Sequence, residues 1–304
     1  MGIGSDIFEL LTKLRTAGHL HPHSAIMEIG AQQLSQDFLA HQEKLAQLAA
    51  LFCVEQPLAL PPPKPSHIVH GELVHLAHDA PPARDFWLWL GFDYAAIDID
   101  GSPDAIPLDL NYDRVPASVA HKYDLVTNFG TTEHIANQLN AFKVIHDLTK
   151  TGGIMLHQLP VQGMLNHGLI NYNLKFFWML ARSNGYKFVH AHWQQSKVAY
   201  SPPADIVDFI NANDETATMP DFKVADAAIN VAMQKSFDIR FIAPIDVTTG
   251  SQTEHKSLRK RYWTVFDQQA FKEFQTRAMT PHRRDWRSLI TSVRWRLRRL
   301  RQSR

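Results

Sequence analysis

Short apolar runs alternate with amphipathic stretches through residues 1–240 of the chain. The runs that predict strands span residues 25–30, 94–99, 107–111, 123–127, 154–159, 186–192 and 227–234. Apolar side chains recur at helical spacing in residues 3–17, 33–52, 137–149 and 175–183. Strands that are followed by a turn and a helix are typical of doubly wound α/β folds. We therefore expect a mostly parallel, seven-stranded sheet with helices on both faces.

Prolines break this pattern between residues 56 and 92. We interpret that stretch as an insertion that contains a small hairpin around Gly71. The chain then divides into segments with different expected roles. These are an N-terminal helix in residues 1–20, the α/β domain in 21–245, an extension in 246–276 and a basic tail in 277–304.

The composition excludes several classes of protein. A hydrophobic content of 45% is too high for a disordered or fibrous chain. No apolar run reaches the roughly 18 residues that a membrane span requires, and no secretory leader is recognisable at the N-terminus. The single cysteine, Cys53, excludes an internal disulfide and a thiolate zinc site. We expect a cytoplasmic protein.

The net charge of +1 hides an asymmetry between the tail and the rest of the chain. Residues 277–304 hold ten arginines and one acidic residue, a net charge of +9, which leaves −8 on the other residues. On a helix the tail's apolar side chains would form one stripe flanked by arginines: Trp286, Leu289, Ile290, Val293, Leu297 and Leu300. This basic C-terminal helix could pack on an acidic body, its own or a partner subunit's. It could also lie on the anionic inner membrane surface or bind RNA phosphates.

Acidic and amide residues follow several of the predicted strands. Glu28 and Gly30 end the first strand, Asp98 ends the second, Asp109 lies in the third and Asn128 follows the fourth. In parallel sheets, ligands bind at the carboxyl ends of the strands. A carboxylate after the second strand can accept both hydrogen bonds of a ribose diol, although a helix cap or a turn uses the same residue type. The combination favours a nucleoside-binding site.

The turn after the first strand narrows the choice of cofactor. Dinucleotide sites use G-x-G-x-x-G, because the backbone must approach a pyrophosphate closely. Here Gly30 is followed by Ala31, Gln32 and Gln33, which argues against a nicotinamide-dependent oxidoreductase. S-adenosylmethionine carries ribose and adenine without phosphate, and its ammonium group favours an acidic first strand, which Glu28 supplies.

Over residues 21–240 the chain resembles the class I, Rossmann-like S-adenosylmethionine-dependent methyltransferases. The matching segments are MEIGAQ (27–32), AIDID (96–100), PLDLN (107–111), YDLVTNFGTTEHI (123–135) and TGGIMLHQLP (151–160). MEIGAQ departs from the family pattern E/D-x-G-x-G-x-G in its later glycines. The resemblance implies that Glu28 and Gly30 line the methionine end of the cofactor and that Asp98 holds its ribose. It also implies that Asp109 and Leu110 flank the adenine and that Asn128 and Phe129 form the pocket floor.

Methyl transfer needs an acceptor held in line with the methyl group and a base that takes the acceptor's proton. Histidine is the natural base near neutral pH, and the candidates are His134, which follows Glu133, and His167 in the loop after the fifth predicted strand. Glu133 is a catalytic candidate beside these histidines. A helix N-terminus would also explain Glu133, and His167 could be an ordinary loop residue. His157 is a further candidate that a hydrogen-bonded core position would also explain.

Two aromatic residues, Tyr172 and Trp178, are expected either to shape the acceptor pocket or to pack in the core. We expect no metal ion, because no H-E-x-x-H or paired-aspartate motif is present.

The sequence thus predicts an S-adenosylmethionine-dependent methyltransferase that acts on an oxygen of a sugar, glycan or other small polar metabolite through a histidine base. The alternatives are N-methylation of a small molecule and a catalytically silent Rossmann-like binding protein. DNA methylation is disfavoured, because the N/D-P-P-Y/F motif of such enzymes is replaced by Asn128-Phe129-Gly130.

Overall fold

The computed structural model divides into two compact units, Met1–Thr248 and Thr249–Arg304, which are described separately. The structure describes residues 2–60, 67–69, 72–74, 80–99, 102, 104–164, 167–200, 224–246 and 255–279. Among these residues, no helix combines the length and the apolar character needed to cross a bilayer.

The first unit is built on the expected seven-stranded sheet, which is mostly parallel. Its strands lie in the order β5 (Ala105–Pro107), β4 (Asp93–Asp98), β1 (Ala25–Ile29), β6 (Tyr123–Phe129), β7 (Thr149–Gln162), β9 (Val224–Gln234) and β8 (Lys187–Tyr200). The first five pair in parallel, and β9 runs antiparallel to both of its neighbours. The order reverses direction between β1 and β6, which is where ligands bind in doubly wound sheets.

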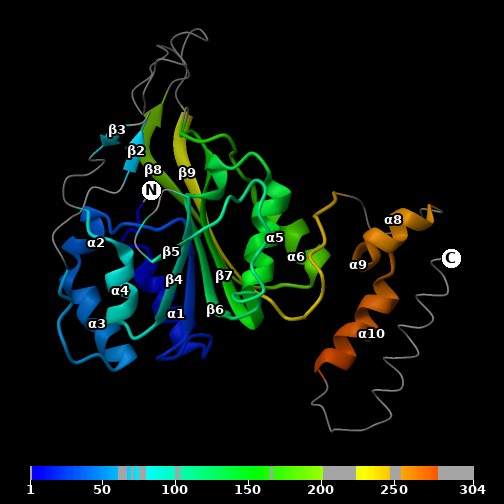
Figure 1. Ribbon diagram of the computed structural model, residues 1–304, viewed down its shortest axis with the longest axis horizontal. Helices are drawn as coiled ribbons and strands as arrows, with labels where there is room; N and C mark the ends of the chain where they lie inside the picture. Colours follow the sequence, from blue (N-terminus) through cyan, green and yellow to red (C-terminus); the bar gives the residue numbers. More distant parts are fainter. Residues whose placement is uncertain are drawn as a thin grey trace. The chain divides into compact units, whose positions relative to one another are not determined.

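Helices cover both faces of the sheet (Figure 1). One face carries α1 (Ile7–Thr16), α2 (Gln36–Ala40), α3 (Gln42–Phe52) and α4 (Ala83–Trp89), and the other carries α5 (Gln138–Leu148) and α6 (Leu174–Asn184). Alternate residues of the central strands serve the two layers, because successive side chains of a strand point to opposite faces. Leu125 packs with the α1–α4 layer, for example, whereas Val126 packs with α5 and α6.

The structure differs from the predicted elements at particular places. The helical stretch 33–52 is two helices that meet at His41. The third predicted strand, 107–111, is the short β5, and Asp109 already lies in the turn that follows it, where its carbonyl accepts the Asp113 amide.

The proline-rich stretch contains both the predicted hairpin and a core helix. β2 (His67–Val69) and β3 (Glu72–Val74) form a two-stranded antiparallel ribbon in which Ile68 lies opposite Leu73. The stretch ends in α4, whose Phe86 and Trp87 are fully buried. Residues 83–89 are therefore part of the main α/β architecture, although the sequence pattern assigned them to an insertion.

The described part of the second unit contains three helices, α8 (Lys256–Arg261), α9 (Trp263–Phe266) and α10 (Gln268–Met279). Trp263 packs against Phe271 and Phe274, with ring centroids 5.8 and 5.9 Å apart. The predicted arginine-flanked stripe, residues 286–300, lies outside the described residues.

Candidate active site

The loops after β1 and β6 are tied together at the carboxyl edge of the sheet. Gly30 has φ +79°, and a Cβ atom there would lie 2.4 Å from Thr131 Oγ1, so no larger residue fits without movement. The Thr131 hydroxyl donates to the Ile29 carbonyl at 2.5 Å, and the Gln32 side-chain amide donates to Thr131 Oγ1 at 3.2 Å. Gly30 thus allows the two central loops to lie in direct contact.

Glu28 holds the loop after β1 in place through hydrogen bonds. Its carboxylate is fully buried and accepts hydrogen bonds from Trp87 Nε1 at 2.7 Å, the Tyr94 hydroxyl at 2.8 Å and the Gln32 amide at 3.2 Å. Burial raises the pKa of Glu28 to about 7, although the three hydrogen bonds act in the opposite direction. The contact of Glu28 with the cofactor stays a prediction, because its side chain is enclosed by protein groups.

Asp98 ends β4 beside the same loop. Its Oδ2 accepts the Ala31 amide at 2.8 Å, and its Oδ1 accepts the Ile99 amide at 2.7 Å. The carboxylate is half-buried and lies next to the turn after β1, as a ribose-binding group should. Asp109 lies in the turn after β5, where its Oδ1 accepts the Asn111 amide at 2.7 Å, and Leu110 is buried.

Asn128 and Phe129, the expected pocket floor, are both buried. The Asn128 amide donates to Thr132 Oγ1 at 2.8 Å, and its oxygen accepts the Thr132 amide at 3.2 Å. Phe129 packs in the core with the α1–α4 layer. Asn128 therefore fixes the turn after β6, and a role for either side chain in the floor of a pocket stays a prediction.

The turn that Asn128 fixes is a 3-10 helix, η1 (Thr132–His134). The Tyr172 hydroxyl donates to Thr132 Oγ1 at 2.9 Å, and the Gln138 side-chain amide donates to the Thr132 carbonyl at 2.7 Å. Tyr172 is itself buried, so it acts on the site by holding Thr132. These bonds set the position of Glu133 and His134.

The loop after β7 lies directly on η1. The Leu169 and Ile170 amides donate to the Glu133 carbonyl at 2.8 and 3.1 Å. A Cβ atom on Gly168 would lie 2.9 Å from Glu133 Cγ, so this approach requires glycine. The preceding residue, His167, is thereby brought to the Glu133 side chain.

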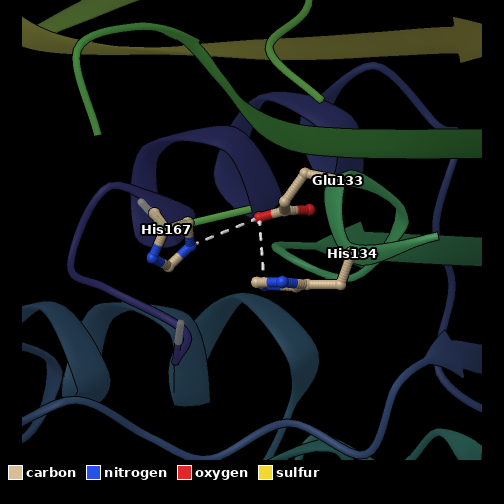
Figure 2. Close-up of side chains that lie close together, drawn as sticks. All are labelled: Glu133, His134 and His167. Carbon is tan, nitrogen blue, oxygen red and sulfur yellow. Dashed lines mark ion pairs between the residues drawn. The ribbon is translucent and has the colours of Figure 1, made fainter. Parts of the chain in front are cut away.

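Glu133, His134 and His167 form a cluster at the carboxyl edge of the sheet, and we call these three residues the E-H-H cluster. Figure 2 shows one carboxylate oxygen of Glu133 facing both imidazoles. Glu133 Oε1 lies 3.9 Å from His134 Nε2 and 3.7 Å from His167 Nε2. The Glu133 side chain is 0% exposed, whereas those of His134 and His167 are 45% and 28% exposed. The cluster therefore has one buried carboxyl group and two histidines that reach solvent.

The cluster's electrostatics favour a neutral imidazole at His134. Burial lowers the pKa of His134, and the nearby Glu133 carboxylate only partly offsets this effect. His134 is therefore mainly unprotonated at neutral pH and able to accept a proton.

The two remaining candidates, His157 and Trp178, differ in their surroundings. His157 is fully buried, its ring centroid lies 5.5 Å from that of Phe142 and 5.4 Å from that of Phe177, and burial lowers its pKa to about 3. The core interpretation of His157 is thus confirmed. Trp178 is exposed and stacks on Phe188, with centroids 5.6 Å apart, so its expected core position is wrong and its role in an acceptor pocket stays a prediction.

Sequence reasoning missed several residues that build the site. Trp87 and Tyr94 donate hydrogen bonds to Glu28. They lie in or beside the proline-rich stretch, so the sequence pattern did not predict this role. Gly168 carried a usable signal, because a glycine directly after a candidate histidine indicates a close backbone approach.

Residues 77–194, from just before α4 into β8, match a family model described as a methyltransferase domain. No curated protein matches the chain significantly. A provisionally assigned methyltransferase from Bacillus halodurans C-125 aligns with 75% of this chain and 99% of its own, at 10% identity and a TM-score of 0.38. The YcgJ protein from Bacillus subtilis aligns with 74% and 97%, at 11% identity and a TM-score of 0.35.

Proposed function

We propose that this chain is a class I methyltransferase that uses S-adenosylmethionine to methylate an oxygen of a sugar or another small polar metabolite. The match of residues 77–194 to a methyltransferase domain supports the family part of this proposal. The cofactor, the acceptor and the base are our inferences from the residues at the carboxyl edge of the sheet.

The residues at this edge include a hydrogen-bond acceptor that suits the ribose of S-adenosylmethionine. Asp98 brings a carboxylate to the end of β4, beside the Ala31 amide, where ribose hydroxyls can donate to it. The cofactor, when bound, supplies a methyl group that is already electrophilic because it is attached to a sulfonium. The protein must therefore position the acceptor and remove its proton.

The position of the E-H-H cluster is the observation that supports deprotonation of a methyl acceptor at this site. It follows β6 directly, and the β6 loop contacts the β1 loop through Thr131 and Ile29. Its histidines are accessible from solvent, and the lowered pKa of His134 leaves an imidazole that can accept a hydroxyl proton. We assign proton removal to His134 or His167, with Glu133 stabilising the resulting imidazolium.

Transfer of a labelled methyl group tests this proposal. The protein is incubated with S-adenosylmethionine labelled in the methyl group and with separate panels of polyhydroxylated and amine acceptors. Labelled product from a hydroxyl acceptor is the expected result. Label on amines alone would favour N-methylation, and cofactor binding without transfer to either panel would favour a catalytically silent binding protein.

Alanine variants of the two histidines identify the base. Loss of the base should lower kcat by about 10²–10⁴-fold with little change in cofactor affinity. His192→Ala, on the exposed part of β8, is the matched control and should keep full activity. If His134 is the base, kcat should fall as the pH drops below the lowered pKa of His134 and the imidazole becomes protonated. Losses of only a few-fold in both variants would exclude these residues as the base.

A further inference from the structure

We propose that the E-H-H cluster is a binding site for one divalent transition-metal ion of the zinc type. The starting observation is the Glu133 carboxylate. It is fully buried, and neither of its oxygens has a hydrogen-bond partner among the described residues. Burying a carboxyl group without hydrogen bonds is costly, and buried polar groups in proteins are hydrogen-bonded, paired with a charge or bound to a metal.

Two potential metal-ligand atoms lie near this carboxylate, and neither is within hydrogen-bond distance of it. His134 Nε2 and His167 Nε2 lie 3.9 and 3.7 Å from Glu133 Oε1, which is too far for a hydrogen bond. One ligand atom from each of the three residues lies within 4.8 Å of the others. Ligands around one zinc ion are about 3–3.5 Å apart, given metal–ligand bonds of about 2.0–2.2 Å. Small rotations of the two partly exposed imidazoles would therefore close the site on an ion.

The backbone holds these ligands together before any ion binds. Thr132 is fixed by Asn128, Gln138 and Tyr172, which sets η1, and the Leu169 and Ile170 amides fasten the next loop to the Glu133 carbonyl. Such support around the ligands is what orients a metal site. The ligands come from two loops separated by α5 and β7, which is why no sequence motif announced them.

The ligand types select the class of ion. Two imidazoles and one carboxylate suit Zn²⁺, Co²⁺ or Fe²⁺, whereas Mg²⁺ and Ca²⁺ prefer oxygen ligands throughout. Three protein ligands with solvent access on the histidine side leave a coordination position open, as in catalytic zinc sites.

The consequence for catalysis rests on the proposed function. A divalent ion lowers the pKa of a hydroxyl group in its coordination sphere, so the acceptor would release its proton to water. In the loaded protein His134 and His167 would then be ligands and not bases. Chelation would abolish turnover if this is right, whereas a simple histidine base would work without metal.

Metal binding can be tested without any methyl transfer. The full chain is stripped with a chelator, and Zn²⁺ is titrated by calorimetry into the wild type and into the variants Glu133→Gln, His134→Gln and His167→Gln. We expect one ion to bind in the low micromolar range or tighter, and about a tenfold or greater loss of affinity in each variant. His255→Gln, in the second unit, is the control and should bind as the wild type does.

Two further measurements keep the test decisive. Co²⁺ should give the visible spectrum of a tetrahedral or five-coordinate ion when bound to the wild type. This spectrum should be absent in His134→Gln, which should still fold because the His134 side chain is partly exposed. Zn²⁺ should raise the Tm of the wild type, since a ligand that binds the native state stabilises it, but not that of Glu133→Gln. Equal Zn²⁺ affinity in the wild type and all three cluster variants, or no binding, would overturn the proposal. Cofactor titration is independent of this result, so the cofactor assignment and the metal site can fail separately, whereas a bound metal ion would exclude the histidine base.

Discussion

At the scale of single residues, two buried carboxyl groups lie at the carboxyl edge of the sheet. Glu28 and Glu133 are both fully buried, but only Glu28 has hydrogen-bond donors around it, from Trp87, Tyr94 and Gln32. The burial of Glu28 is therefore explained by these hydrogen bonds, which hold the β1 loop in place. Neither oxygen of Glu133 has a hydrogen-bond partner within the described residues, and this observation is the basis of the proposed metal site.

The raised pKa of Glu28 predicts how stability depends on pH. Its pKa of about 7 in the folded protein lies above the ordinary value of 4.5, so between these values the native state binds more protons than the unfolded state. The contribution of Glu28 to the free energy of unfolding should therefore fall as pH rises from 4.5 to 7, by about 3 kcal/mol.

Denaturant unfolding at pH 5 and pH 7.5 measures this contribution. Glu28→Gln keeps the shape of the side chain but does not titrate, so the wild type should lose stability relative to this variant across the interval. A constant difference between the two proteins at both pH values would contradict the burial of an ionisable Glu28.

At the scale of elements, the periodic parts of the chain were predictable and the contacts between loops were not. The strands at 25–30 and 123–127 are central and apolar, so their pattern was clear. Helix α4 was missed because Pro81 and Pro82 precede it and its apolar run is short. The E-H-H residues were individually predicted, but their convergence depends on the path of the β7 loop over Glu133, which local sequence does not encode.

Gly168 tests whether that path matters. Gly168→Ala would press a Cβ atom to 2.9 Å from Glu133 Cγ, so the loop must move and carry His167 with it. We expect kcat to fall about tenfold or more, because small displacements of catalytic groups are costly, while cofactor affinity stays the same. Leu169→Ala changes an exposed neighbour and should retain activity. An unchanged kcat in Gly168→Ala would show that the position of His167 does not matter for catalysis.

At the scale of the whole molecule, the two compact units have different charges and different expected tasks. The first contains the complete sheet and every proposed site residue. The second contains helices α8 to α10 and the basic tail, residues 277–304, with its net charge of +9. We propose that this tail mediates self-association or attachment to an anionic membrane surface.

Deletion of residues 277–304 tests the division of tasks. The truncated protein should bind cofactor as the full chain does, because its site residues lie in the first unit. Light scattering should show a smaller oligomer, or sedimentation with anionic lipid vesicles should show weaker binding. Loss of cofactor binding in the truncated protein would show instead that the tail belongs to the catalytic fold.

The central claim is that the carboxyl edge of the sheet binds S-adenosylmethionine through Asp98, and calorimetric titration tests it most directly. The wild type should bind S-adenosylmethionine and its demethylated product, and Asp98→Ala should abolish binding, because the ribose loses its carboxylate partner. Asp93→Ala, at the opposite end of β4, is the matched control and should bind normally. Equal affinity in the wild type and in a folded Asp98→Ala variant would contradict the account.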